Sequence, residues 1–121
     1  MLVALRRRGV RYDDGKMSWL FLLVAGLFEI AWPIGLKLAQ VDERRVMGIV
    51  IAIAGMALSG AFLYLAQREI AIGTAYAVWT GIGAAGTFFV GIWFFGDAAS
   101  LGRYLGALLI VMGVVALKLA P

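Results

Sequence analysis

The 121-residue chain is 64% hydrophobic and only 15% charged, whereas soluble domains are about 45–50% apolar and about 25% charged. This composition predicts a membrane protein with one domain. The chain contains no cysteine and no histidine, which excludes disulfides, thiolate or imidazole metal sites, and Ser-His or Cys-His nucleophiles. Residues 1–16 carry five basic and two acidic residues, so they supply most of the +4 net charge and no nucleic-acid partner is expected.

Four apolar runs, at about 18–39, 46–66, 71–95 and 101–120, are each close to the roughly 20 residues that a helix needs to cross a bilayer. Lipid offers no partner to exposed backbone groups, so each run predicts an α-helix. The connections are short and therefore predict antiparallel neighbours, with Ser100 as the N-cap of the last helix. We expect an all-α membrane protein whose four transmembrane helices form one transporter domain over residues 17–121.

The segment 1–16 is expected to be an extension without regular structure. It places an apolar stretch before its basic residues, the reverse of the order in a signal peptide. Met17 is a natural start for the first span. An arm that touches anionic lipid headgroups is the alternative interpretation.

Glu29 lies in the middle of the first apolar run. A charge at the centre of a bilayer costs at least about 2.5–3.5 kcal/mol, so such a residue typically marks a transport or proton-relay site. No basic residue of the chain is expected in the same membrane layer to neutralise it. Glu29 is therefore the first candidate for a binding residue.

Polar and aromatic residues share helical faces with this acid. In the first helix Gly26, Glu29 and Trp32 form one stripe, and the second and third helices carry comparable stripes. A carboxylate, hydroxyl groups and indole N–H groups suit a cation or a proton, and aromatic faces attract cations. Packing or interface anchoring is the alternative for the aromatic residues, and a bond to its own helix is the alternative for the serine. The predicted binding residues are Glu29, Trp32, Ser59, Tyr76 and Trp79.

Proline and glycine residues predict where the helices bend or pack closely. Pro33 lacks the amide that would bond to the Glu29 carbonyl, so it loosens the helix at the acid, although a kink without a role is equally consistent. Small residues allow close helix approach. The predicted bending or packing residues are Gly26, Pro33, Gly81, Gly83 and Gly86. The last helix carries Gly102, Gly106 and Gly113, which we interpret as a dimerisation face.

Two segments closely resemble the small multidrug resistance transporters. They are M-S-W-L-F-L-L-V-A-G-L-F-E at 17–29 and G-T-A-Y-A-V-W-T-G-I-G at 73–83. The four-span layout is similar as well, and the resemblance runs from Met17 to about Leu119. Within the family, Glu29 followed by Trp32 and Lys37 resembles the guanidinium-exporter subtype. Pro33 departs from the usual pattern.

The resemblance implies an antiparallel homodimer in the bacterial inner membrane, in which two chains insert with opposite orientations. It also implies a site built from both copies of Glu29 and proton-coupled export of guanidinium or small guanidinyl cations. No cofactor is implied, because the proton gradient drives export and no phosphate-binding loop is present. Some relatives act as pairs of non-identical chains, so a heterodimer stays open.

The expected mechanism is competition, in which Glu29 holds either a proton or a cation. A carboxylate matches the forked donors of guanidinium in bidentate fashion. The first alternative is an exporter of quaternary ammonium or aromatic cations, against which Trp32 argues by filling space. A second alternative is a subunit of a lipid-linked sugar flippase, which would not need an isolated acid. With one membrane carboxylate and no metal ligands, an enzyme is not expected.

Overall fold

The computed structural model describes residues 14–121. Over that range the regular structure is helical and comprises α2 (Asp14–Leu38), the 3-10 turn η1 (Asp42–Arg44), α3 (Arg45–Ala66), α4 (Ile72–Phe94) and α5 (Leu101–Leu119). The four long helices are each long and apolar enough to cross a membrane. This confirms the predicted all-helical, four-span organisation, and the protein is an integral membrane protein.

The start of the first helix differs from the prediction. α2 begins at Asp14 rather than at 18, so residues 14–16 form its first turn instead of belonging to an extension without structure. Lengthening an existing helix adds one backbone hydrogen bond for each residue ordered, which makes an added turn inexpensive. The expectation for residues 1–13 lies outside the described residues.

Two local predictions concern helix ends and breaks. The Arg103 backbone N–H donates to Ser100 Oγ at 3.4 Å, which confirms Ser100 as the N-cap of α5. Pro33 lies inside α2, and the helix continues through it to Leu38. The missing proline amide therefore leaves the helix unbroken, although the Glu29 carbonyl loses its usual helical partner.

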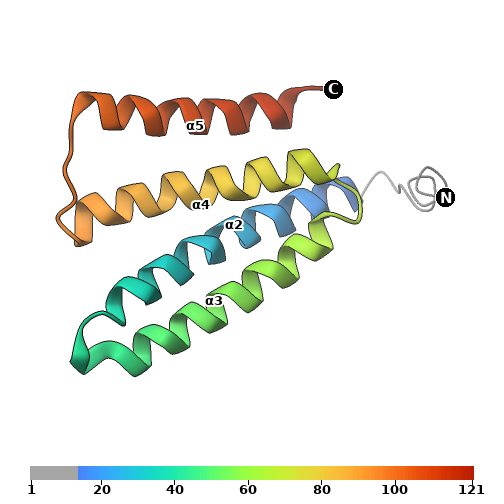
Figure 1. Ribbon diagram of the computed structural model, residues 1–121. Helices are drawn as coiled ribbons and strands as arrows, with labels where there is room; N and C mark the ends of the chain where they lie inside the picture. Colours follow the sequence, from blue (N-terminus) through green and yellow to red (C-terminus); the bar gives the residue numbers. More distant parts are fainter. Residues whose placement is uncertain (1–13) are drawn as a thin grey trace.

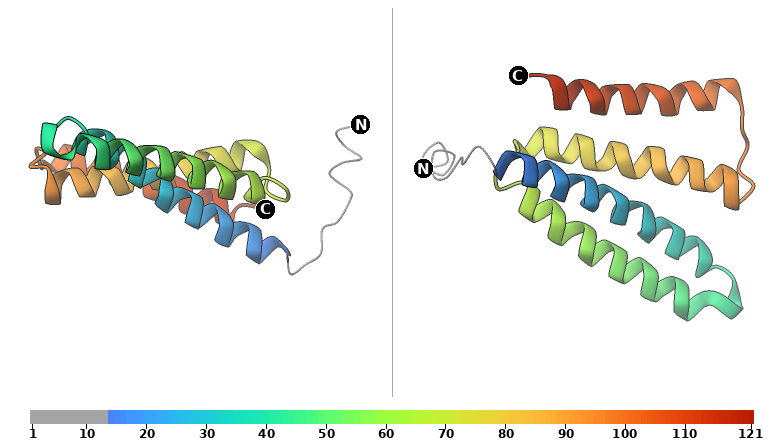
Figure 2. Two further views of the ribbon diagram at one scale, coloured as in Figure 1. Left: turned by 90° about the horizontal axis from the view of Figure 1, so that it is seen from below. Right: turned by 180° about the vertical axis from the view of Figure 1, so that it is seen from behind.

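The four helices lie side by side in the order α3, α2, α4, α5, as Figure 1 shows from one side and Figure 2 from behind. α2 packs most extensively on α3 and also on α4, whereas α5 contacts α4. Successive helices run in opposite directions. The α2–α3 and α4–α5 connections therefore lie at one end of the molecule, and the start of α2, the α3–α4 connection and the C-terminus lie at the other.

The contact between α2 and α3 depends on two glycines that face each other. A Cβ atom added to Gly35 would lie 2.6 Å from the Ala52 backbone nitrogen and 2.6 Å from the Gly48 carbonyl oxygen. A Cβ atom on Gly48 would collide with the Ala39 backbone nitrogen in the same way. Because backbone atoms cannot move aside as side chains can, glycine is the residue that allows this approach.

The buried apolar core is small and lies where α2 begins. Leu22 of α2 is fully buried there, together with residues from the facing ends of α3 and α4. The cluster consists of Leu22, Ala66, Ile70, Ala75 and Val78. Large apolar side chains elsewhere are exposed on the single chain, which is the arrangement expected of surfaces that face lipid or another protein.

Candidate functional site

Ser59 is the point at which the three inner helices meet. Its side chain is fully buried on α3, and the Trp79 indole Nε1–H of α4 donates to Ser59 Oγ at 2.7 Å. Ser59 Oγ lies 2.7 Å from the Ala25 carbonyl oxygen and 3.2 Å from Glu29 Oε2, both on α2. One hydroxyl thus links the predicted acid, the predicted indole and the backbone of the first helix.

The hydroxyl of Ser59 has one proton to donate and two lone pairs with which to accept. Trp79 occupies one lone pair. When Glu29 carries a proton, it can donate to the second lone pair, and Ser59 then donates to the Ala25 carbonyl. When Glu29 is ionised, the Ser59 proton can turn to the carboxylate. The Ala25 carbonyl then gives up its bond to Ser59, so the single hydroxyl serves Glu29 in either protonation state but serves the carbonyl only when Glu29 is protonated.

Glu29 is half-buried and opens onto a hollow of about 390 Å³ between α2 and α4. Gly83 makes room for the acid, because a Cβ atom at that position would lie 2.5 Å from Glu29 Cγ. Thr80 and Thr87 line the same hollow, and the Thr80 hydroxyl donates to the Tyr76 carbonyl of its own helix at 2.8 Å. The carboxylate therefore faces a space lined by threonine side chains as well as by apolar residues.

The structure does not bring all five predicted binding residues together within one chain. Tyr76 is 57% exposed, and its ring lies 5.4 Å from the Trp79 ring, tilted by 54°. Trp32 is half-buried on α2. Among residues 14–121, neither the Tyr76 hydroxyl nor the Trp32 indole makes a hydrogen bond to the Glu29 cluster. Glu29, Ser59 and Trp79 form the connected part of the site.

The glycines predicted for packing lie against neighbouring helices. A Cβ atom on Gly26 would lie 2.7 Å from Ile82, and one on Gly86 would collide with Ile30, so both lie on the α2–α4 contact. Gly81 faces Val114 of α5. In contrast, Gly102, Gly106 and Gly113 of α5 have no atom within 4 Å of an added Cβ. Their face of α5 is open in the single chain.

Several polar groups of the site were absent from the sequence-based candidates. Among them are the Ala25 carbonyl and the side chains of Thr80, Thr87 and Asp97. A signal for the threonines exists, because Tyr76, Thr80, Gly83 and Thr87 follow a spacing of four, three and four residues, which places them on one helical face. The carbonyl has no such signal, because its role depends on where α3 places Ser59.

Residues 14–121 do not gather three or more Asp, Glu, His or Cys side chains as a metal site would require. The donor set around Glu29 is one carboxylate with hydroxyl and indole groups, and it suits protons and organic cations more than metal ions. Among the described residues, every buried side-chain nitrogen and oxygen has a hydrogen-bond partner.

The chain is similar to known membrane transporters over most of its length. Residues 17–110 match the model of the Small Multidrug Resistance protein family. Two similar relatives, from Citrobacter freundii and Salmonella typhimurium, are each 49% identical over 104 residues, covering 86% of this chain and 98% of theirs. A relative from Proteus vulgaris is 46% identical over 86% of this chain and 99% of its own length. All three are named guanidinium exporter. The four spans, the match over most of the chain and the identity to these transporters together show that the chain belongs to the small multidrug resistance family.

Proposed function

We propose that this protein exports guanidinium or small guanidinyl cations across the bacterial inner membrane in exchange for protons. The observation that carries the proposal is the Glu29 carboxylate, which is bonded to Ser59 at 3.2 Å and opens onto the hollow between α2 and α4. The names of the relatives support guanidinium as the cargo. The proton gradient supplies the energy, and no cofactor takes part.

The chemistry of the cluster suits alternate binding of a proton and a cation. A protonated Glu29 has a partner in Ser59, and an ionised Glu29 can keep that partner while one of its oxygens faces the hollow. Guanidinium is planar and presents forked N–H donors that match a carboxylate. Because proton and cation use the same oxygens, the entry of one drives the exit of the other.

The proposed assembly is an antiparallel homodimer with both copies of Glu29 facing one cavity. The open glycine face of α5 supports a second copy, because small residues allow close helix contact. The exposed Tyr76 ring supports it too, since a phenol at that position is free to reach the partner's acid. After Met17 the Lys and Arg residues are distributed four to two between the two ends of the helices, which is a weak bias, and a weak bias favours insertion in both orientations.

Orientation is tested by cysteine labelling, for which the cysteine-free chain is well suited. Glu43→Cys and Arg68→Cys place one thiol at each end of the helices. We expect a membrane-impermeant maleimide to label about half of the copies of each variant from outside whole cells, because both orientations are populated. Labelling of one variant in every copy and of the other in none would contradict the antiparallel dimer.

The transport mechanism is tested by proton release in detergent. Adding guanidinium to the wild-type protein should release protons into a weakly buffered solution, and guanidinium binding should weaken as the pH falls. Glu29→Gln keeps the shape of the side chain but has no ionisable proton, so both effects should disappear while the protein stays folded. Tetraphenylphosphonium, a bulky cation, should release far fewer protons from the wild-type protein.

The matched control is Glu69→Gln. Glu69 is also half-buried and accepts a bond from a serine, Ser18, at 3.2 Å, but it lies in the α3–α4 connection. This variant should release protons as the wild-type protein does. Proton release from the Glu29→Gln variant on addition of guanidinium would show that Glu29 is not the shared site.

A further inference from the structure

A second acid, Asp97, is folded back against the end of α4. Gly96 adopts a φ of +70°, a left-handed conformation that glycine tolerates well. The turn lets the Asp97 backbone N–H donate to the Gly91 carbonyl at 3.0 Å. The Asp97 carboxylate then lies against Gly91, where any Cβ atom would collide with it. The backbone therefore holds this acid beside the bundle.

Asp97 lines two spaces at this end of the molecule, one of which is also lined by Glu29. A cavity of about 190 Å³ at this end of the molecule is lined by Asp97, Pro33, Thr87 and Lys37, among others. Asp97, Pro33 and Thr87 also line the hollow that contains Glu29. Because three residues are common to both, the two spaces adjoin. A cation that enters from this end passes Asp97 before it reaches Glu29.

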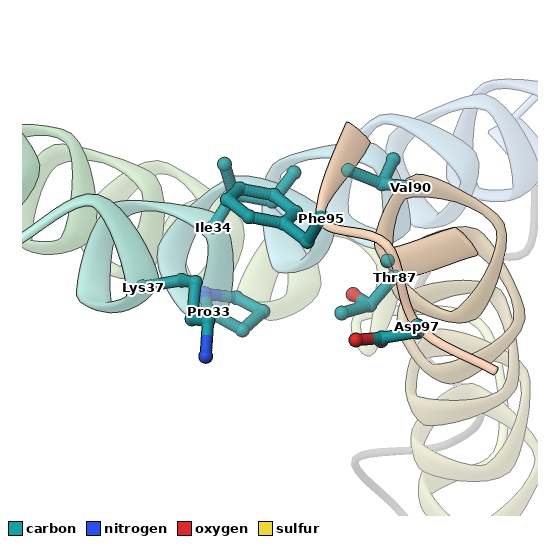
Figure 3. A pocket seen from close by; sticks show the side chains of 8 residues that line it. Pro33, Ile34, Lys37, Thr87, Val90, Phe95 and Asp97 are labelled. Atoms are coloured by element: carbon teal, nitrogen blue, oxygen red, sulfur yellow. The ribbon is translucent and has the colours of Figure 1, made fainter. Parts of the chain in front are cut away.

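The two walls of the outer cavity carry opposite charges (Figure 3). Pro33 and Lys37 of α2 form one wall, and Thr87 and Asp97 form the other, with their oxygen atoms turned toward α2. In the described part of the chain, Arg45 with Asp42 is the only ion pair within 4.0 Å. The charged groups of Lys37 and Asp97 are therefore farther apart than that. The Asp97 carboxylate is thus available to a small cation.

We propose that Asp97 and Thr87 form an outer subsite for the guanidinium cation, and that Lys37 on the facing wall opposes its occupancy. This inference rests on the proposed export of guanidinium and adds a binding step before Glu29. A carboxylate and a hydroxyl side by side accept two of the N–H donors of a flat cation. The cavity volume equals that of about six water molecules, which is sufficient for such an ion.

The subsite affects how guanidinium is captured from solution and does not affect its exchange with a proton at Glu29. A negative charge at the mouth raises the local concentration of cations, and salt screens this effect over about 30 Å at 0.01 M and about 3 Å at 1 M. Asp97 and Lys37 are both exposed, so water weakens their interaction with a cation. The expected effect is therefore a modest change in KM with the maximal rate unchanged.

The first experiment measures guanidinium uptake into proteoliposomes at about 0.01 M and about 1 M salt. Asp97→Asn should raise KM roughly two- to fivefold at low salt, and Lys37→Gln should lower it, because the two side chains act on the cation with opposite signs. Both changes should shrink at high salt. Glu43→Gln is the matched control, because Glu43 is an exposed acid on η1 at the same end that does not line the cavity.

Two results of this experiment would overturn the subsite. One is a change in KM for Asp97→Asn no larger than that for Glu43→Gln, and the other is a change of the same sign for Asp97→Asn and Lys37→Gln. Failure of the wild-type protein to transport guanidinium at all would instead contradict the proposed function. The two failures are therefore distinguishable.

The second experiment detects the subsite without transport. In the Glu29→Gln protein the central site is disabled, and guanidinium chloride should still shift the amide resonances of Asp97 and Gly91 in a saturable manner. Sodium chloride at equal ionic strength should not. Adding Asp97→Asn to this protein should abolish the shift. Persistence of the shift in the double variant, or its absence from the Glu29→Gln protein, would overturn the proposal.

Discussion

The α2–α3 contact and α5 use the same residue type in opposite ways. Gly35 and Gly48 bring the backbones of α2 and α3 together so closely that no Cβ atom fits. A Cβ atom added to Gly102 or Gly106 of α5 would have no atom within 4 Å. Glycine thus completes a contact within the chain in one region and leaves a surface unfilled in the other. The difference indicates that the single chain supplies the packing partners of the α2 and α3 glycines but not those of the α5 glycines.

Burial shows the same contrast. Glu29, Ser59 and Trp79 connect the three inner helices through one hydroxyl, whereas Ala107 is the buried residue of α5. α5 contacts α4 near its start, where the Tyr104 ring lies 6.0 and 6.3 Å from the Phe88 and Phe89 rings between centroids, and again farther along, where Val114 packs beside Gly81. The inner helices therefore hold the site, and α5 presents a face to its surroundings.

The largest expected effect is at the α2–α3 contact. Gly48→Leu forces a side chain between two backbones, and overpacking typically costs about 1–3 kcal/mol or more. We expect the protein to lose its folded state in detergent, measured by circular dichroism and by size-exclusion chromatography. Gly60→Leu is the control on the same helix, because an added Cβ there has no atom within 4 Å. Equal loss of folding in both variants would show that close backbone contact at Gly48 does not make that glycine more important than Gly60.

A smaller effect is expected on α5, where a bulky substitution should weaken the dimer and leave the fold of each chain intact. Gly106→Ile adds bulk to the open face and should weaken dimerisation by about tenfold or more, since small residues permit close helix contact. Sedimentation equilibrium in detergent measures the association, and circular dichroism shows whether the helices are intact. Gly60→Ile is the control outside α5. A dimer of wild-type strength in Gly106→Ile would show that this face does not meet a second copy.

The smallest of the three effects is expected where the inner helices meet. Ser59→Ala leaves the part-buried Trp79 N–H without its acceptor, which costs up to about 1–3 kcal/mol, and takes a partner from Glu29. We expect guanidinium affinity to fall roughly tenfold while the dimer persists, as measured by isothermal titration calorimetry. Ser18→Ala is the control, because Ser18 is also buried but bonds to Glu69. Equal loss of affinity in both variants would mean that the cluster has no special role in binding.

The pattern of apolar residues predicted the four spans because a helix in lipid needs a continuous apolar run of sufficient length. It predicted Ser100 as a helix cap because a serine just before a helix accepts a hydrogen bond from a backbone N–H of the first turn, which is a local interaction. The first turn of α2 was placed too late because residues 14–16 are not apolar and a helix can extend beyond its membrane segment. Local signals therefore located the helices well and their ends less well.

What the sequence by itself determined is the set of chemical groups: a lone membrane carboxylate, a serine and indoles on helical faces, and a row of glycines on the last helix. The tertiary structure decided which of them meet. Periodicity assigns a residue to a face but does not set the register between two helices. Only the packing of α2 on α3 and α4 placed Ser59 between Ala25, Glu29 and Trp79, and only the turn at Gly96 brought Asp97 to the hollow that Glu29 lines. Those distances follow from close backbone contact between helices far apart in the sequence, which no local pattern contains.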